Sequence, residues 1–264
     1  MDESSFRAAD IILDHAFGLL LLLARIGAIF ALLPGIGESS IPATVKAGLI
    51  LSLTLLLLPS LAPLLPPRPI NELRFAGLIV IEMANGLWFG WLARVVVSGL
   101  PLAGQFIADV SGMANVLMPS PDLGSQTSAV SRLYEVAVPV LMLSTGLYMI
   151  PLSALSGYYQ LIPPGVFALA PPFLGDSATL TLGTMARAFD LALRLASPFI
   201  LTGVAWNVAI GLVARLVPRM QIFFVATPGQ IGVGLLLLAM LAHSLLAAWS
   251  EAARIGFATL PGGG

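Results

Sequence analysis

Long apolar runs, separated by breaks rich in proline and glycine, restrict this chain more than any other feature. Residues 11–33 and 47–65 form the first two runs, and each is long enough to cross the hydrocarbon core of a bilayer as an α-helix. Later runs begin near Leu73, at Val136, near Leu180 and at Ile222. Inside a bilayer, only a helix or a closed barrel satisfies the backbone polar groups. The runs predict an all-α, polytopic membrane protein made of kinked helical hairpins.

The composition excludes a soluble protein and several kinds of binding chemistry. Only 9% of the 264 residues are charged, whereas soluble domains average about 25%. The net charge of −1 provides no basic surface for nucleic acid. The absence of cysteine excludes disulfides and thiolate metal sites. We expect membrane lipid, and no nucleic acid, among the partners.

Catalytic and metal-binding patterns are missing as well. His15 and His243 are the only histidines and stand far apart in the sequence, whereas a zinc site needs three or four ligands in one place. The sequence has no phosphate-binding loop, nucleophile elbow or zinc-protease motif. It therefore predicts a protein that is not an enzyme and that uses no cofactor.

A helical hairpin is expected at each end of the chain. The first covers residues 11–65, and the second consists of the two long runs that meet near Pro218. Between the hairpins, the run Val136–Tyr159 contains Pro139 and Pro151, so it is either one kinked helix or two short ones. The proline-rich residues that follow it, 161–175, are expected to form a turn rather than a span.

Isolated charged residues inside the apolar runs are the strongest functional signal. Charges inside a membrane are costly and mark a pathway, a proton relay or a contact with another subunit. Glu82 and Arg94 are too far apart on one helix to pair, since helix neighbours are three or four residues apart. Each is expected to meet another element or another subunit. The charges that we assign to subunit contacts are Arg25, Glu82, Arg94, Asp109, Arg132 and Glu135.

Gly86 and Gly90 form a G-x-x-x-G pair inside the third run. Small residues at this spacing allow two apolar helices to approach closely. Coincidence is the alternative, because the chain contains 26 glycines.

The stretch Gly104–Gly124 is unlike the rest of the chain. It begins like a helix that carries Asp109, and it then breaks into small residues, methionines and the prolines Pro119 and Pro121. Irregular backbone at membrane depth is tolerated only where protein covers it or water solvates it. We therefore expect this stretch to face a cavity inside a protein-lined channel.

Three blocks of sequence carry a recognisable family pattern. The first contains Ala24-Arg-Ile-Gly and the segment from Ile41-Pro-Ala to Lys46-Ala-Gly-Leu, and the second is Gly104-Gln-Phe-Ile with Gly112. The third and most specific runs from Asn207 to Arg215 and continues through Pro218-Arg-Met-Gln-Ile-Phe-Phe-Val to Pro228. In these blocks, which cover nearly the whole chain in family order, the sequence resembles the FliR/SctT family of type III secretion export-gate subunits.

The resemblance implies one copy of this chain in a helical, pore-forming export gate of the bacterial inner membrane, within the flagellar basal body. It implies FliP-type, FliQ-type and FlhB-type subunits as partners and unfolded export substrates as cargo. It also implies a FliP-like part over residues 1–176 and a FliQ-like hairpin over residues 177–264. The acidic N-terminus is not a secretory signal, and we expect it to be retained and not cytoplasmic.

The central loop of this family plugs the closed pore, which the resemblance places at about residues 112–124. Where the family often has Glu, this chain has Gln105, and where the family has aromatic residues and Asp-Pro, it has Asn115–Asp122. Flexible methionines and aliphatic side chains would therefore form the seal, with ordinary helix packing as the alternative for the methionines. The plug residues are expected to be Met113, Asn115, Val116, Leu117, Met118, Pro119 and Pro121.

A basic turn that contains Arg215, Pro218 and Arg219 is expected to face the cytoplasmic entrance. Two other functions remain open on the residues alone. A small secondary transporter would use Glu82, Asp109 or Glu135 as ion or proton sites, although such transporters usually contain paired repeats and none is evident here. A scaffold subunit that transports nothing is the other alternative.

Overall fold

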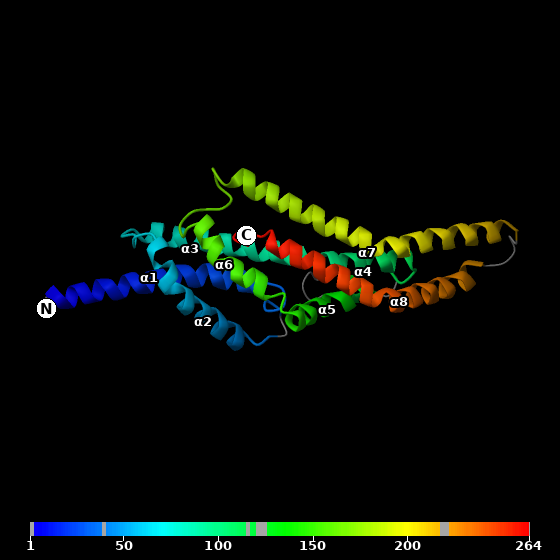
Figure 1. The fold of residues 1–264 in the computed structure, drawn as a ribbon, viewed down its shortest axis with the longest axis horizontal. Coiled ribbons are helices and arrows are strands. Elements are labelled where there is room, and N and C mark those ends of the chain that lie inside the picture. Colours follow the sequence, from blue (N-terminus) through cyan, green and yellow to red (C-terminus); the bar gives the residue numbers. More distant parts are fainter. Residues whose placement is uncertain (1–2, 39–40, 115–116, 120–125, 217–221, 264) are drawn as a thin grey trace. The chain divides into compact units, whose positions relative to one another are not determined.

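The computed structural model describes residues 3–38, 41–114, 117–119, 126–216 and 222–263. These residues are almost entirely helical (Figure 1), which confirms the all-α class. The helices are α1 (Glu3–Leu32), α2 (Ala43–Leu61), α3 (Glu72–Val97), α4 (Gly99–Val110), α5 (Ala129–Thr145), α6 (Met149–Leu161), α7 (Leu174–Leu216) and α8 (Ile222–Ala258). A short 3-10 helix, η1 (Ala62–Leu64), follows α2, and two three-residue strands, β1 (Leu117–Pro119) and β2 (Gln126–Ser128), lie between α4 and α5.

Five helices in the described ranges are long and apolar enough to cross a membrane, namely α1, α2, α3, α7 and α8. A sixth span results if α5 and α6 together count as one broken crossing. The polytopic membrane protein predicted from the apolar runs is thus confirmed. With 43 residues, α7 would measure about 65 Å at 1.5 Å per residue, about twice the thickness of a bilayer core.

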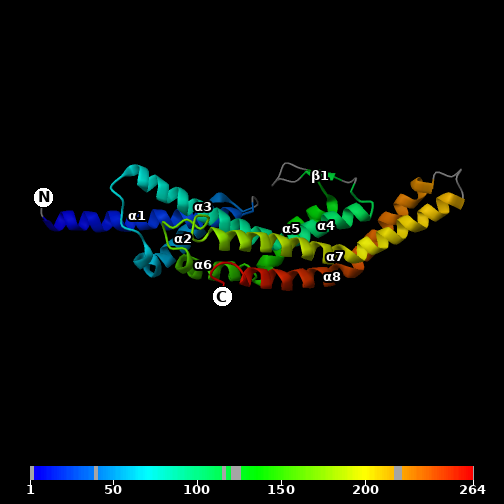
Figure 2. The ribbon, with the colours of Figure 1, turned by 90° about the horizontal axis from the view of Figure 1, so that it is seen from above.

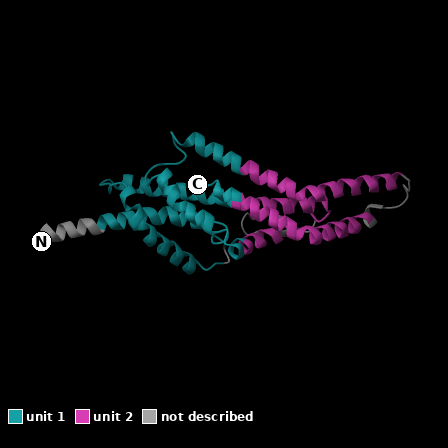
Figure 3. Ribbon diagram, viewed as in Figure 1, with its two compact units in different colours: residues 1–95, 142–184, 255–264 teal, residues 96–141, 185–254 magenta. Residues whose placement is uncertain are grey.

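The chain divides into two compact units, each assembled from segments that are distant in sequence (Figure 3). Unit 1 contains residues 1–95, 142–184 and 255–264, and unit 2 contains residues 96–141 and 185–254. This division follows packing within the chain. The predicted boundary between residues 176 and 177 follows the family resemblance and stays a prediction.

In unit 1, α1 packs against α2, which confirms the N-terminal hairpin. Lys46 closes the turn between them, because its Nζ donates a hydrogen bond to the carbonyl oxygen of Gly37 at 3.0 Å. At the other end of the hairpin, Gly18 lies against the side chain of Leu65. Many side chains of α2 remain exposed.

The glycine pair of α3 marks a close helix contact. A Cβ atom at Gly86 would collide with the carbonyl oxygen of Arg25 on α1, and a Cβ at Gly90 would lie 2.8 Å from the carbonyl oxygen of Ile29. Glycine at both positions therefore lets the backbones of α1 and α3 approach closely. Of the two alternatives for the G-x-x-x-G pair, the structure supports the packing motif.

The run from Val136 to Tyr159 forms two helices, and a glycine separates them. Gly146 adopts a φ of +74° between α5 and α6, a conformation that glycine adopts at little cost. Pro139 lies inside α5, and Pro151 is the third residue of α6. In the first turn of a helix, the missing N–H of proline costs little because that N–H has no intrahelical acceptor.

In unit 2, α4 packs against α5 and α7. A Cβ atom at Gly104 would lie 2.8 Å from the Cα atom of Ser131 on α5, and the rings of Phe106 and Phe189 make an edge contact at 5.8 Å. The last part of α7 and the first part of α8 run side by side (Figure 2). They correspond to the long C-terminal hairpin expected from the sequence, whose turn at Pro218 lies outside the described residues.

Candidate functional site

The last turns of α4 connect that helix to β2. Gln105 Nε2 donates to Asp109 Oδ1 at 3.0 Å, and Gln105 Oε1 accepts a hydrogen bond from the backbone N–H of Ser128 at 3.2 Å. Ser131 Oγ also donates to the carbonyl oxygen of Pro101 at 2.9 Å. An amide can serve as donor and acceptor at once, whereas an ionised Glu at position 105 would only accept. Glutamine is thus well suited to link Asp109 with Ser128.

Strand β1 lies within the predicted plug, and β2 follows directly after it. They pair antiparallel, with Leu117 opposite Ser128, Met118 opposite Thr127 and Pro119 opposite Gln126. The link from Gln105 to Ser128 therefore connects this ladder to α4.

The predicted plug residues fall into two groups. The side chain of Met113 is only 6% exposed and lies near Gly234 on α8. The backbone of Leu117, Met118 and Pro119 forms β1. Asn115, Val116 and Pro121, together with the side chains of residues 117–119, lie outside the described part of the chain. The sealing role of all seven residues stays a prediction.

A buried ion pair joins α1 to α3 in unit 1. Arg25 Nε lies 2.7 Å from Glu82 Oε2, Arg25 Nη2 lies 3.1 Å from Glu82 Oε1, and both side chains are fully buried. The guanidinium carbon of Arg25 is 5.2 Å and 4.5 Å from the ring centroids of Tyr158 and Tyr159. At these distances the aromatic faces attract the cation. Each charge therefore has a partner inside this chain.

The same pair holds the segment between α6 and α7. Arg25 Nη1 donates to the carbonyl oxygen of Ile162 at 2.7 Å, and Glu82 Oε1 accepts from the N–H of Gly165 at 2.7 Å. Asn85, one turn after Glu82 on α3, donates to the carbonyl oxygen of Val166 at 2.7 Å and accepts from the N–H of Ala168 at 2.9 Å. These bonds satisfy buried backbone groups of a segment that has no ladder of its own.

The sequence reasoning did not identify Asn85 or Tyr158 as part of this cluster. The hydroxyl of Tyr158 donates to the carbonyl oxygen of Asn85 at 2.9 Å. A usable signal was present, because Asn85 is three residues after Glu82 and residues at that spacing share a helix face.

The other predicted charges are distributed over both units. Arg94 approaches Glu38 at 3.9 Å, and Arg132 pairs with Glu135 at 2.8 Å within α5. Arg215 is exposed near the end of α7, whereas Pro218 and Arg219 lie outside the described residues. The subunit-contact role of these charges and the entrance role of the turn stay predictions.

The three acids that a transporter would use do not form one site. Glu82 is paired with Arg25, Asp109 with Gln105 and Glu135 with Arg132. Within the described ranges, no group of three or more acidic or histidine side chains could hold a metal ion.

Comparison with known proteins places the chain in a family. The model of the bacterial export proteins, family 1, matches residues 16–254. Flagellar biosynthetic protein FliR of Caulobacter vibrioides is 31% identical over 89% of this chain and 92% of that protein. The Bacillus subtilis protein of the same name is 25% identical over 86% of each chain. Yop proteins translocation protein T of Yersinia pestis is 25% identical over 92% of this chain and 93% of its own. The chain therefore belongs to the bacterial export proteins of family 1, as its resemblance to the FliR/SctT family predicted.

Proposed function

We propose that this chain is a single-copy pore subunit of the flagellar type III protein export gate and that it contributes the plug that closes the pore. Membership of the export family supports a role in protein secretion, and the names of the flagellar and Yop relatives support the type III system. Five helices able to cross a membrane support an integral membrane location, which we assign to the bacterial inner membrane.

The plug proposal rests on the way the loop after α4 is held, by strand pairing and by a hydrogen bond to α4. The loop leaves a helix, and residues 117–119 within it pair with residues 126–128 through β1 and β2. Gln105 connects the ladder to α4. A loop anchored in this way can project an irregular segment from a fixed point, as a closure requires. In an all-helical membrane protein, such a segment must face protein or water rather than lipid.

The exposed apolar faces of α7 and α8 support assembly with other subunits. Leu201 on α7 and Met240 on α8 are 72% and 71% exposed. Because α7 would be about 65 Å long, lipid can cover only part of its length, and an apolar face outside the bilayer needs protein against it. We assign FliP-type and FliQ-type subunits to this role, with an FlhB-type subunit at the entrance and unfolded export substrates in the pore.

The paired acids do not favour the transporter alternative. Glu82 accepts hydrogen bonds from Arg25 and from the N–H of Gly165, so its oxygens are occupied. A transported ion or proton would have to break the buried pair. We therefore propose no ion-coupled transport by this chain.

Deleting residues 112–124 in cells that assemble the whole gate tests the plug. Ion and small-solute leakage should rise, while export is partly retained. A Gly-Ser segment of equal length in place of residues 114–124 shows whether loop length or side-chain chemistry makes the seal. The control is Ser197→Ala, since in the ranges that the structure describes the exposed hydroxyl of Ser197 bonds only within its own helix, to the carbonyl oxygen of Arg194. Unchanged permeability in a fully assembled deletion complex would overturn the plug proposal.

A further inference from the structure

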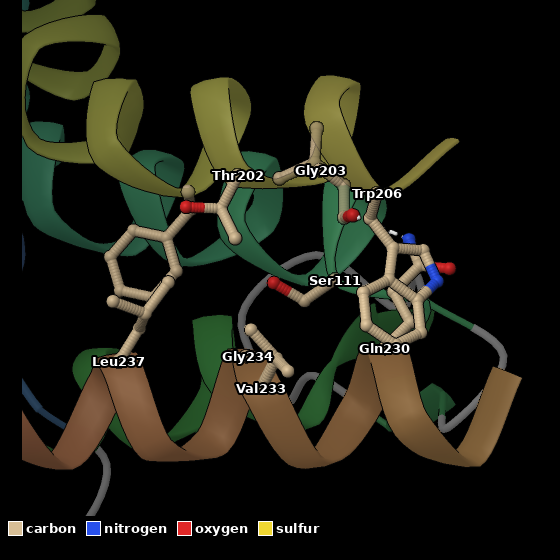
Figure 4. Close-up of a pocket in the computed structure, with 10 residues that line it drawn as sticks. Ser111, Thr202, Gly203, Trp206, Gln230, Val233, Gly234 and Leu237 are labelled. Atoms are coloured by element: carbon tan, nitrogen blue, oxygen red, sulfur yellow. Dashed lines mark hydrogen bonds between the residues drawn. The ribbon is translucent and has the colours of Figure 1, made fainter. Parts of the chain in front are cut away.

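The end of α4 is held by a side chain from α8. Val110 is the last residue of α4, so its carbonyl oxygen is one of the four that have no N–H donor inside the helix. Gln230 Nε2 donates a hydrogen bond to this oxygen at 2.8 Å (Figure 4). A side chain 120 residues away thus caps the helix that leads into the loop.

Two glycines bring α7 and α8 against the same point. A Cβ atom at Gly203 on α7 would lie 2.8 Å from the carbonyl oxygen of Val110. A Cβ atom at Gly234 on α8 would lie 2.7 Å from Ser111 Cβ. Both separations are shorter than a packed Cβ tolerates, so both helices approach the end of α4 as closely as glycine permits. We call Gly203, Gln230 and Gly234 the α4 seat.

The chain leaves the α4 seat in a defined direction. Gly112 has a φ of +73°, and the N–H of Met113 donates to the carbonyl oxygen of Ala108 at 2.9 Å. This is the bond of a Schellman motif, which ends a helix with a glycine in the left-handed conformation. Met113 is buried, and its Cε lies 3.5 Å from the position of a Cβ on Gly234.

The cavity beside the α4 seat is too small for a ligand. Its volume is about 10 Å³, roughly the room that one water molecule needs. Ser111, directly after α4, and Thr202 and Trp206 on α7 face it (Figure 4). These residues therefore pack against the end of α4 and do not form a binding site.

We propose that Gln230 is a positioning residue, which with Gly203 and Gly234 fixes residues 110–113 and thereby sets where the plug begins. This inference rests on the proposed plug function. It assigns to the C-terminal helices a second task besides packing on partner subunits, because they hold the base of a loop that is more than 75 residues earlier in the sequence.

The first test replaces Gln230 with Leu in the complete, assembled gate. The substitution leaves the carbonyl oxygen of Val110 without its donor, which should increase the unseated form about tenfold. Ion leakage should rise in the same proportion while assembly is retained. Thr202→Val is the matched control, because Thr202 lines the same cavity but its hydroxyl, among the described residues, bonds only to the carbonyl oxygen of Pro198 on its own helix. Assembled Gln230→Leu complexes that leak no more than the control would overturn the proposal.

A compensating pair tests the seat without removing the hydrogen bond. Gly234→Ala adds a methyl group 2.7 Å from Ser111 Cβ, so it should raise leakage. Adding Ser111→Gly removes the opposing side chain and should restore a sealed gate. If the double variant leaks as much as Gly234→Ala alone, the close contact does not position the loop and the proposal fails.

Combining Gln230→Leu with deletion of residues 112–124 separates the two proposals. If the seat acts through the plug, the combined variant should leak no more than the deletion alone, because non-additivity identifies residues that act together. A deletion that causes no leakage would overturn the plug itself. If the deletion leaks and adding Gln230→Leu increases that leakage further, only the proposed role of the α4 seat would be overturned.

Discussion

Arg25 Nε lies 2.7 Å from Glu82 Oε2, and neither side chain is exposed. The two residues are 57 positions apart and come from α1 and α3. Together with the backbone of Ile162 and Gly165, they form a closed set of hydrogen bonds inside unit 1. This cluster ties three segments of the chain together.

Removing one partner of this pair should destabilise unit 1 strongly. Arg25→Ala or Glu82→Ala leaves an unpaired buried charge, which costs about 3–5 kcal/mol. We expect both variants to lower assembly of the gate more than they alter the conductance of the pores that do form. Co-purification with the partner subunits and single-pore recording measure the two effects.

The double variant Arg25→Met/Glu82→Leu is the control for charge, because it removes both ions and leaves apolar side chains. It should assemble better than either single variant. Normal assembly of both single variants would contradict a stabilising role for the pair.

Asn85→Leu should loosen the segment between α6 and α7. The change leaves the carbonyl oxygen of Val166 and the N–H of Ala168 without partners, at a cost of about 2 kcal/mol. Amide hydrogen exchange at Ala168 should accelerate. Asn207→Leu is the control, because within the described part of the chain the amide of Asn207 bonds only to the carbonyl oxygen of Gly203 in α7. Equal exchange at Ala168 in the two variants would contradict a role of Asn85 in holding this segment.

Alanine at the glycines of α3 should separate packing from helix propensity. Gly86→Ala and Gly90→Ala introduce Cβ atoms into contacts with the backbone of α1, so both should lower the thermal stability of the purified complex. Gly77→Ala, on the same helix with nothing within 4 Å, should be neutral or stabilising by up to about 1 kcal/mol. A similar loss of stability at Gly77 and Gly86 would argue against the close contact.

Gln105→Leu should release β2 from α4. The N–H of Ser128 would lose its acceptor, and its hydrogen exchange should accelerate about tenfold. Gln105→Glu retains an acceptor oxygen and should keep Ser128 protected, although it places a second acid four residues before Asp109. Protection of Ser128 that survives Gln105→Leu would show that another group holds the strand.

The helices and several of their contacts could be predicted from residue patterns alone. Apolar length predicted the spans, the alternation of runs and breaks predicted the N-terminal hairpin, and the spacing of Gly86 and Gly90 indicated a close contact. All of these are local properties, because helix formation and helix faces depend on residues within a few positions of one another. The position of the break between α5 and α6 could not be predicted from the sequence. Pro139 and Pro151 indicated a kink, whereas the break lies at Gly146.

Residue patterns established that this chain is an all-α membrane protein with an irregular central stretch, and its motifs indicated the export family. The packing of the helices was needed to show that Arg25 meets Glu82 and that Gln230 caps the end of α4. Such pairings depend on which helices lie beside one another, and apolar periodicity shows that a face is buried without showing what covers it. A polar side chain in an apolar run therefore predicts that it has a polar contact, and the fold determines which residue makes that contact.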